Sequence, residues 1–208
     1  MKKSDIIAVV ILGEIVAVFV GFVIKGLGIN FPLPFFTLYI LLPIVALIAN
    51  AIFYFIGKKI PVFFQFAKFI TVGLANTAVD FGILNFLMLS SKVYEGKTVI
   101  LFNVISFLIA AIHSYIWNKL WTFKAKEKVN VASQFLQFVV VSCIGVLINS
   151  GIIYIIITWI HPMAGAAAWA NIAKVVATAI SLLWNFVGYK FIVFKQKNGE
   201  QPSNIPQI

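Results

Sequence analysis

The chain has 208 residues, of which 62% are hydrophobic and 11% are charged. An ordinary soluble domain has about 25% charged residues, so this composition indicates an integral membrane protein and excludes an ordinary soluble enzyme. The net charge of +10 comes from lysine alone, because the sequence contains no arginine. Cys143 has no second cysteine to pair with, which excludes an intrachain disulfide and a cysteine-based metal site.

Six apolar runs follow one another along the chain, and each is long enough to cross about 30 Å of hydrocarbon as a helix. They lie near residues 6–24, 36–56, 66–90, 98–118, 134–160 and 167–189. The predicted fold class is all-α integral membrane, with six transmembrane helices. The first run follows two lysines, as a secretory signal would, but it is long and contains Glu14, so we expect a retained helix. Residues 196–208 are polar and contain two prolines, and we expect a disordered tail.

The lysines are divided unequally between the two sides of the predicted bundle. When successive connections are assigned to alternate sides, twelve lysines fall on one side, and the other side holds only Lys25, Lys92 and Lys97. The remaining one, Lys174, lies inside a helix. The lysine-rich side of a membrane protein faces the cytoplasm, which places both termini there. An even number of helices requires the same arrangement.

The four later helices contain an internal repeat. The segment FAKFITVGLANTAVDFGIL, beginning at Phe66, aligns with FLQFVVVSCIGVLINSGII, beginning at Phe135, at an offset of 69. The segment SYIWNKLWTF from Ser114 aligns with NFVGYKFIVF from Asn185 at an offset of 71. Each repeat holds two helices, so the repeats are parallel, and we expect a transport path between them. The predicted domains are an N-terminal hairpin at 1–60, a four-helix domain at 61–195 with repeats at 64–124 and 133–195, and the tail at 196–208.

Polar residues recur on these apolar helices, where an ionisable group costs about 2.5 to 3.5 kcal/mol on insertion scales. Residues spaced by three or four share one face of a helix, so they form polar stripes. We expect Asp80 and Lys174 to lie at similar depth and to pair. The alternative is that the stripes are interhelical hydrogen bonds, worth about 0.6 kcal/mol each. The candidate substrate-binding and translocation residues are Asn76, Thr77, Asp80, Asn103, Ser114, Asn118, Lys119, Lys174, Ser181, Asn185 and Lys190.

The polar motifs and the repeat together resemble the GtrA-like family of small membrane proteins. The resemblance covers about residues 64–195. It implies a function in moving polyprenyl-phosphate-linked sugars across the bacterial cytoplasmic membrane. The chain departs from the family pattern at Lys119, where arginine is frequent, and in the extra hairpin at 1–60, whose role is open. The motifs that carry the resemblance are Phe66, Val72-Gly73, Asn76-Thr77, Asp80, Asn103, Ser106-Phe107, Asn118-Lys119, Trp121-Thr122-Phe123, Lys174 and Asn185-Phe186.

The implied function is that of a flippase, or a flippase subunit, for an undecaprenyl-phosphate-linked monosaccharide used in cell-surface polysaccharide or teichoic acid glycosylation. Lys68, Lys119 and Lys190 occur at equivalent helix ends, where an ammonium group is suited to hold a lipid phosphate. We favour Lys119 and Lys190 over Lys68 and expect these two to converge on one phosphate. The polar stripes carry the sugar in this interpretation, while the polyprenyl tail stays in lipid. The expected partners are this lipid, other membrane lipids, a membrane glycosyltransferase and a second copy in a homodimer, with no nucleic acid.

Two alternatives belong to other functional classes. A membrane scaffold that does not transport, but recruits or stabilises a glycosyltransferase, is the second interpretation. An enzyme ranks third, because the sequence has no Asp-x-Asp pair to hold a nucleotide sugar through a metal. It also has no Walker motif, so we expect transport to follow a gradient or the consumption of the carrier. We expect no cofactor and no metal. His113 has no second histidine near it, and we expect a hydrogen-bonded core residue.

The lysine distribution predicts a topology that cysteine labelling tests. In a Cys143→Ser background, a single cysteine at Asn130 is expected to react only with reagents that enter the cell, because this connection is predicted to be cytoplasmic. A single cysteine in the connection at 92–97 is the control and is expected to react from outside. Labelling of position 130 by an impermeant reagent in intact cells would contradict the predicted orientation.

Overall fold

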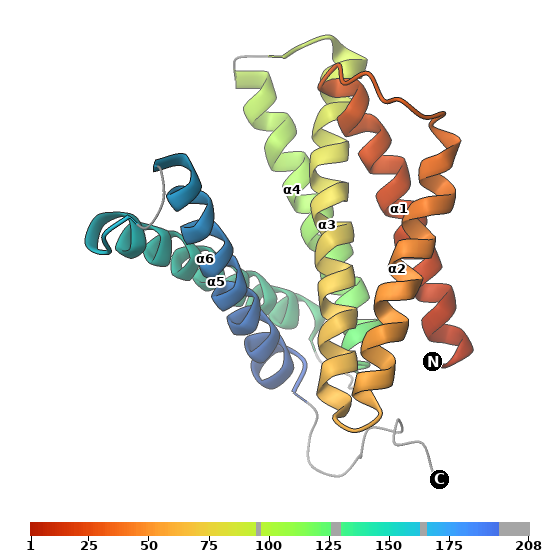
Figure 1. Cartoon of the computed structure of the whole chain (residues 1–208), viewed down its shortest axis with the longest axis vertical. Helices are drawn as coiled ribbons and strands as arrows, with labels where there is room; N and C mark the ends of the chain where they lie inside the picture. The colour runs from red at the N-terminus through yellow and green to blue at the C-terminus, as the bar shows by residue number, and fades with distance from the viewer. Residues whose placement is uncertain (95–96, 126–129, 163–165, 196–208) are drawn as a thin grey trace. The chain divides into compact units, whose positions relative to one another are not determined.

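The computed structural model describes residues 1–94, 97–125, 130–162 and 166–195, and all regular elements within these ranges are helical. In these ranges six helices are long and apolar enough to cross a membrane (Figure 1). The predicted all-α membrane architecture is therefore confirmed, and the predicted tail at 196–208 lies outside the described residues. The helices are α1 (Lys3–Gly26), α2 (Phe36–Gly57), α3 (Pro61–Ser91), α4 (Lys97–Trp117), α5 (Val131–Trp159) and α6 (Ala166–Gly188), and the π-helical segments η1 (Asn118–Thr122) and η2 (Tyr189–Val193) continue α4 and α6.

Local chemistry explains where the two longest helices begin and where one of them ends. α3 begins at Pro61, earlier than the predicted start at residue 66, because proline suits the first turn of a helix, where an N–H has no intrahelical partner. Lys92 adopts a left-handed φ of 57° and ends α3. α5 begins after Asn130, whose side-chain oxygen accepts the N–H of Ser133 at 3.2 Å.

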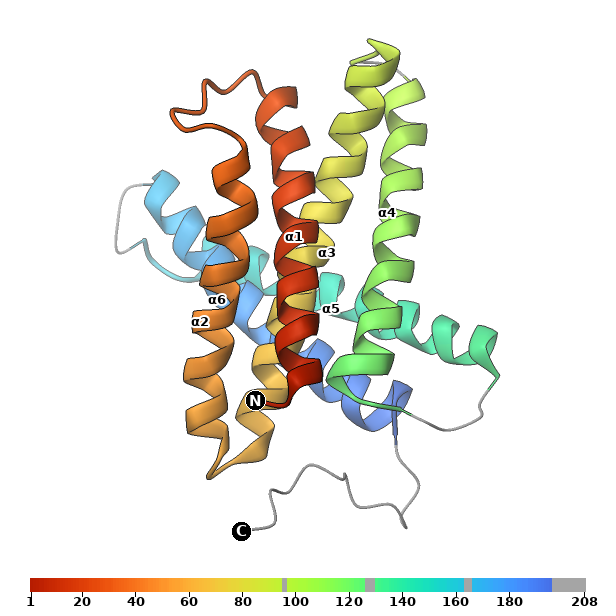
Figure 2. The same ribbon diagram turned by 90° about the vertical axis from the view of Figure 1, so that its right-hand side faces the viewer.

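The chain forms two compact units, Met1–Lys124 and Ala125–Ile208. In the first unit, α1 packs against both α2 and α3, and α4 packs along α3 (Figures 1 and 2). In the second unit, α5 packs against α6. The N-terminal hairpin therefore shares a unit with the first repeat, while the domain boundaries at residues 60 and 195 stay a prediction.

The N-terminal hairpin packs closely within the first unit. Gly13 of α1 lies against the backbone of Pro43 in α2, at a position where a side chain would overlap that proline. Helix α1 therefore belongs to the core of this unit and does not lie beside it as a separate anchor. The buried residues of α1 meet those of α3 and η1 in one core cluster, made of Ala8, Val9, Leu12, Val72, Ala75 and Trp121.

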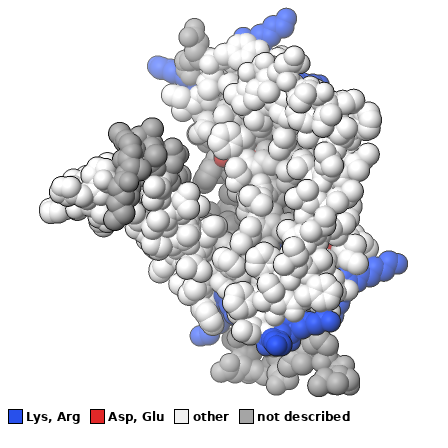
Figure 3. All heavy atoms as spheres, viewed as in Figure 1, with Lys and Arg blue, Asp and Glu red and all other residues white. Residues whose placement is uncertain are grey.

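The surface of the first unit has charged ends and an apolar middle. In the view of Figure 3, lysine side chains lie toward the two ends of the α1 to α4 bundle, and the middle of this face is largely uncharged. Large apolar side chains such as Ile48, Phe55 and Ile100 are exposed on its helices. This distribution fits a bundle whose centre lies in hydrocarbon and whose ends reach the lipid headgroups.

The two repeats form the same aromatic contacts. Phe66 and Phe69 of α3 stack with their ring centroids 6.3 Å apart. Phe135 and Phe138 of α5 stack with the same centroid distance, 6.3 Å. The offset of 69 that aligns the two sequences relates the two pairs, so the repeat is visible in side-chain contacts as well as in sequence.

Each repeat also ends its second helix in a π-helical segment. The N–H of Phe123 donates to the carbonyl of Asn118 at 2.8 Å, and the N–H of Phe194 donates to that of Tyr189 at 2.8 Å. These bonds join residues five apart, which is the π-helical spacing, and such segments are frequent at functional sites. The two segments are related by the offset of 71, and they carry the two lysines at which the sequence predicts phosphate binding.

A glutamine of the preceding helix holds each π-helical segment. The Nε2 of Gln65 donates to the carbonyl of Thr122 at 3.2 Å, and the Nε2 of Gln134 donates to the carbonyl of Val193 at 3.0 Å. A carbonyl at the end of a helix has no intrahelical partner, so these side chains satisfy an acceptor that would otherwise be orphaned. The glutamines tie the two helices of each repeat together.

Replacing Gln134 tests this role. Gln134→Leu is expected to destabilise the protein by about 1 to 3 kcal/mol, because the Val193 carbonyl then loses its partner. Gln137→Leu is the control, because Gln137 lies on the same helix and is exposed. Thermal unfolding in detergent measures both. Equal unfolding temperatures for the two variants would contradict the role given to Gln134.

Candidate functional site

A charged polar contact joins α3 and α4 in the first unit. The hydroxyl of Ser106 lies 2.7 Å from Oδ1 of Asp80 and 3.0 Å from the backbone oxygen of Asn103, so it donates to one or the other. Ser106 is fully buried and Asp80 is half-buried, whereas the side chain of Asn103 is exposed. The structure therefore brings Asp80 to α4 and leaves Asn103 to contribute only its carbonyl.

Asn76 and Thr77 lie one turn before Asp80 on α3 and differ in what they offer. Thr77 is exposed, and its hydroxyl donates back to the carbonyl of Gly73 at 3.1 Å, so its donor is used within the helix. Asn76 is half-buried, and its Oδ1 is buried without a hydrogen-bond partner among the described residues. Asn76 is therefore the residue of this pair with a buried acceptor that lacks a partner.

His113 on α4 differs from the expected hydrogen-bonded core residue. Both of its ring nitrogens are buried and lack a hydrogen-bond partner in the described part of the chain. Its ring lies 6.3 Å from that of Trp117. An imidazole always has one donor or acceptor to satisfy at each nitrogen, so His113 adds two further unsatisfied polar atoms to the first unit.

An amide, a hydroxyl and an ammonium group lie close together where α4 ends and η1 begins. The Nδ2 of Asn118 donates to the carbonyl of Ser114 at 2.9 Å and to its hydroxyl at 3.2 Å, while the buried Oδ1 has no partner among the described residues. The Nζ of Lys119 donates to the hydroxyl of Tyr115 at 3.3 Å and lies 5.5 Å from its ring centre. The sequence-predicted residues Ser114, Asn118 and Lys119 therefore lie on consecutive turns.

A polar contact also joins the two helices of the second unit, without a charge and through other positions of the second helix. Asn149 of α5 occupies the position of Asp80, and its Nδ2 lies 3.5 Å from Oγ1 of Thr178 and 3.4 Å from Oγ of Ser181. Ser181 is buried and donates to the carbonyl of Thr178 at 3.1 Å. The same place in the fold thus holds a carboxylate in one unit and a neutral amide in the other.

A further asparagine lies on the first helix in one repeat and on the second helix in the other. Gly145 occupies the position of Asn76 at the offset of 69, and Asn185 occupies that of Ser114 at the offset of 71. The side chain of Asn185 lies against Gly145 and fills the space that a side chain at residue 145 would take. Its Oδ1, like that of Asn76, is buried without a partner among the described residues. Asn76 in the first unit and Asn185 in the second therefore each have an unused acceptor, as Asn118 does.

Lys190 and Lys174 complete the set of sequence-predicted residues. Lys190 is half-buried, and its Nζ lies 5.8 Å from the ring centre of Phe186 and 5.5 Å from that of Phe191. The side chain of Lys174 lies outside the described side chains. The pairing of Asp80 with Lys174 stays a prediction, and the hydroxyl of Ser106 is the partner that the structure gives to Asp80.

The structure also contains a buried ion pair that sequence reasoning missed. Lys68 is counted above among the lysines of the cytoplasmic side, but it is only 5% exposed and pairs with Asp5 of α1. The indole N–H of Trp121 donates to the same carboxylate. The sequence feature that could have indicated this ion pair is Asp5, an acidic residue next to an apolar run. Its partner depends on how α1 packs.

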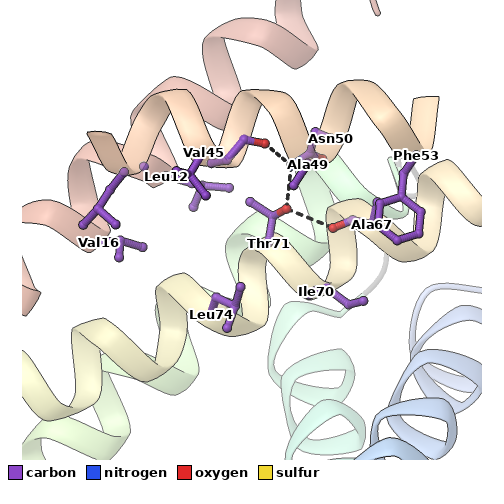
Figure 4. Close-up of a pocket in the computed structure, with 13 residues that line it drawn as sticks. Leu12, Val16, Val45, Ala49, Asn50, Phe53, Ala67, Ile70, Thr71 and Leu74 are labelled. Carbon is purple, nitrogen blue, oxygen red and sulfur yellow. Dashed lines mark hydrogen bonds between the residues drawn. The ribbon is translucent and has the colours of Figure 1, made fainter. Parts of the chain in front are cut away.

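An apolar pocket lies between α1, α2 and α3 (Figure 4). Its volume is about 190 Å³, and its lining is apolar except for Asn50 and Thr71. The Nδ2 of Asn50 donates to Oγ1 of Thr71 at 2.8 Å and to the carbonyl of Ala46 at 3.0 Å. The Oδ1 of Asn50 has no partner among the described residues. Sequence reasoning missed Asn50, a lone amide in an apolar run, and the uncharged pocket does not suit a phosphate.

The contact between Asn185 and Gly145 predicts that a substitution at residue 185 compensates for one at residue 145. Gly145→Ala is expected to destabilise the protein by about 1 to 3 kcal/mol, because the new methyl group overlaps the Asn185 side chain. Adding Asn185→Ser, the residue type found at Ser114, is expected to restore most of the loss. Gly151→Ala is the control, because its added methyl group meets open space. Thermal unfolding in detergent measures the series, and additive losses in the double variant would contradict the contact.

Comparison with known proteins places this arrangement in a family. Residues 68–194 match the family described as GtrA/DPMS, transmembrane domain, and all eleven sequence-predicted site residues lie within them. The chain is similar to an uncharacterized membrane protein, YngA, of Bacillus subtilis (strain 168), with 28% identity over 127 residues that cover 61% of this chain and 77% of the relative. No solved structure matches the chain. The resemblance noted in the sequence is confirmed, and the chain belongs to the GtrA/DPMS transmembrane domain family.

Proposed function

We propose that the protein carries a polyprenyl-phosphate-linked sugar across the bacterial cytoplasmic membrane, as a flippase or as a subunit of one. The lipid is an undecaprenyl-phosphate monosaccharide that serves the glycosylation of a surface polysaccharide or teichoic acid. Family membership supports the handling of such lipids. The inference that the protein transports these lipids, and does not only bind them, rests on the polar groups inside the membrane-spanning helices.

The observation that carries the proposal is that two residues of the polar stripes, Asn76 in the first unit and Asn185 in the second, each have an unused carboxamide oxygen. Oδ1 of Asn76 and Oδ1 of Asn185 are buried without a partner among the described residues. A buried acceptor without a donor costs about 1 to 3 kcal/mol in protein mutational data. Sugar hydroxyls are donors, so a passing sugar supplies what these oxygens lack. The contacts of Asp80 and Asn149 provide further exchangeable partners in each unit.

The phosphate needs different chemistry from the sugar. Lys119 and Lys190 lie at equivalent positions of η1 and η2, next to aromatic rings that hold their ammonium groups. An ammonium group is a compact point charge, which attracts a phosphate without selecting its orientation. Lysine therefore gives affinity for the carrier, and the amides of Asn76 and Asn185 give selectivity among sugars. The polyprenyl tail stays in lipid, and consumption of the carrier on the far side drives net movement.

Reconstitution of the purified protein tests whether it transports. Vesicles that contain only this protein are loaded with a radiolabelled undecaprenyl-phosphate sugar, and label that reaches the opposite leaflet is measured with a sugar-modifying reagent. Crossing is expected to exceed that of protein-free vesicles. A scaffold that only recruits a glycosyltransferase would give no crossing, and this result would contradict the proposal.

The different roles proposed for the lysines and the amides predict different effects when each is replaced. Lys119→Gln with Lys190→Gln is expected to weaken binding of all such lipids by about tenfold or more, because charge-assisted hydrogen bonds contribute about 1.5 to 3 kcal/mol. Asn76→Ala is expected to change the ratio of crossing rates between two sugars on the same carrier. Lys92→Gln with Lys97→Gln is the control, since it removes the same charge from two exposed sites. Unchanged binding in the first double variant would show that Lys119 and Lys190 only orient the protein.

A further inference from the structure

The N-terminal helix places one carboxylate against two donors from other elements. Oδ1 of Asp5 lies 2.5 Å from Nζ of Lys68 on α3 and 3.1 Å from Nε1 of Trp121 in η1. The three residues are only 3%, 5% and 6% exposed, in that order. Two donors that converge on one oxygen away from water form an anion-binding site, because each charge-assisted bond is stronger there than in solvent.

The donors of this site are held independently of the carboxylate. The Nζ of Lys68 lies 4.5 Å from the ring centre of Phe64 and 5.3 Å from that of Trp121, so two aromatic faces also attract the ammonium group. Lys68 and Trp121 both belong to the residues that match the family, whereas Asp5 precedes them. The family domain thus supplies the donors, and the additional hairpin supplies the anion.

The surroundings of the site are more positive than Asp5 alone neutralises. The charges of Lys2 and Lys124 both act on Lys68, and that of Lys124 also acts on Asp5. In the second repeat, the positions equivalent to Lys68 and Trp121 hold glutamine and isoleucine, which provide neither a cation nor an indole N–H. The Lys68 cation and the Trp121 indole are therefore particular to the first repeat, and the added charge of Lys2 and Lys124 favours an anion with more than one charge.

Building on the function proposed above, we propose that Lys68 and Trp121 form a binding site for the phosphate of a membrane lipid, and that Asp5 fills this site as an internal competitor. A phosphate presents several oxygens to the same two donors and meets the added charge of Lys2 and Lys124. Asp5 lies in the first turn of α1. Opening that turn withdraws the carboxylate, while the buried residues farther along α1 keep the helix in place.

Binding of farnesyl phosphate to the purified full chain tests this proposal. If Asp5 fills the site for about 90% of the time, Asp5→Asn is expected to tighten the binding about tenfold. The double variant Asp5→Asn with Lys68→Gln is the matched control and is expected to lose this gain. Farnesol, which lacks the phosphate, and inorganic phosphate, which lacks the lipid, are measured in parallel. Both are expected to bind more weakly than farnesyl phosphate.

Each outcome decides between a phosphate site and a purely structural ion pair. Equal binding to wild type and Asp5→Asn would overturn the proposal, and equal binding of inorganic phosphate and farnesyl phosphate would overturn the assignment to a lipid. If Asp5→Asn folds poorly, its folded yield with farnesyl phosphate is compared with its yield with farnesol. Recovery only with the phosphate supports the site, and no recovery overturns it. Because the probe carries no sugar and no transport is measured, this test can succeed even if the transport assay fails.

Discussion

Hydrocarbon offers no hydrogen bonds, so each polar group inside a membrane-spanning helix needs a partner from the protein or from a molecule that enters it. Many polar side chains of this chain find that partner on their own helix. Thr71 and Ser142, for example, donate to the carbonyl one turn earlier at 2.9 and 2.8 Å. Both hydroxyls also bond another helical segment, Thr71 by accepting from Asn50 and Ser142 through Tyr189, so they need no partner from outside the protein. The exceptions within the described residues include the buried carboxamide oxygens of Asn50, Asn76, Asn118 and Asn185, and the proposed function assigns a transient partner to those of Asn76 and Asn185.

The same constraint acts on both repeats, but different residues meet it. The first repeat has a carboxylate at residue 80 and a buried ion pair with α1, whereas the second has the amide of Asn149 and no such pair at the equivalent positions. A buried charge pair contributes little net stability compared with apolar packing, so a structural need alone does not explain why Asp5 and Lys68 are present. The two halves therefore offer similar geometry with unequal charge. Such inequality suits a substrate that combines a neutral sugar with an anionic phosphate.

Much of the fold follows from the sequence, because long apolar runs and an internal offset are properties of the chain itself. The six spans and the equivalence of the repeats are of this kind. Contacts of individual side chains do not follow from the sequence. The spacing by three or four puts Asn76 and Thr77 on one region of α3, but it does not reveal that the Thr77 hydroxyl bonds back to its own helix. The burial of Lys68 depends on which helix covers it, and nothing in residues 66–90 says that α1 does. The π-helical ends likewise arise from a hydrogen-bond pattern that residue types do not encode.

In the proposed function, the unused Oδ1 atoms of Asn76 and Asn185 mark the path of the sugar. Photo-crosslinking tests this path, with benzoyl-phenylalanine placed at residue 76 or 185 and an undecaprenyl-phosphate lipid whose sugar alone is radiolabelled. The control position is Ile48, an exposed apolar residue of α2. We expect label on the protein from positions 76 and 185 and none from position 48. Equal label from all three positions, or label from position 48 alone, would contradict it.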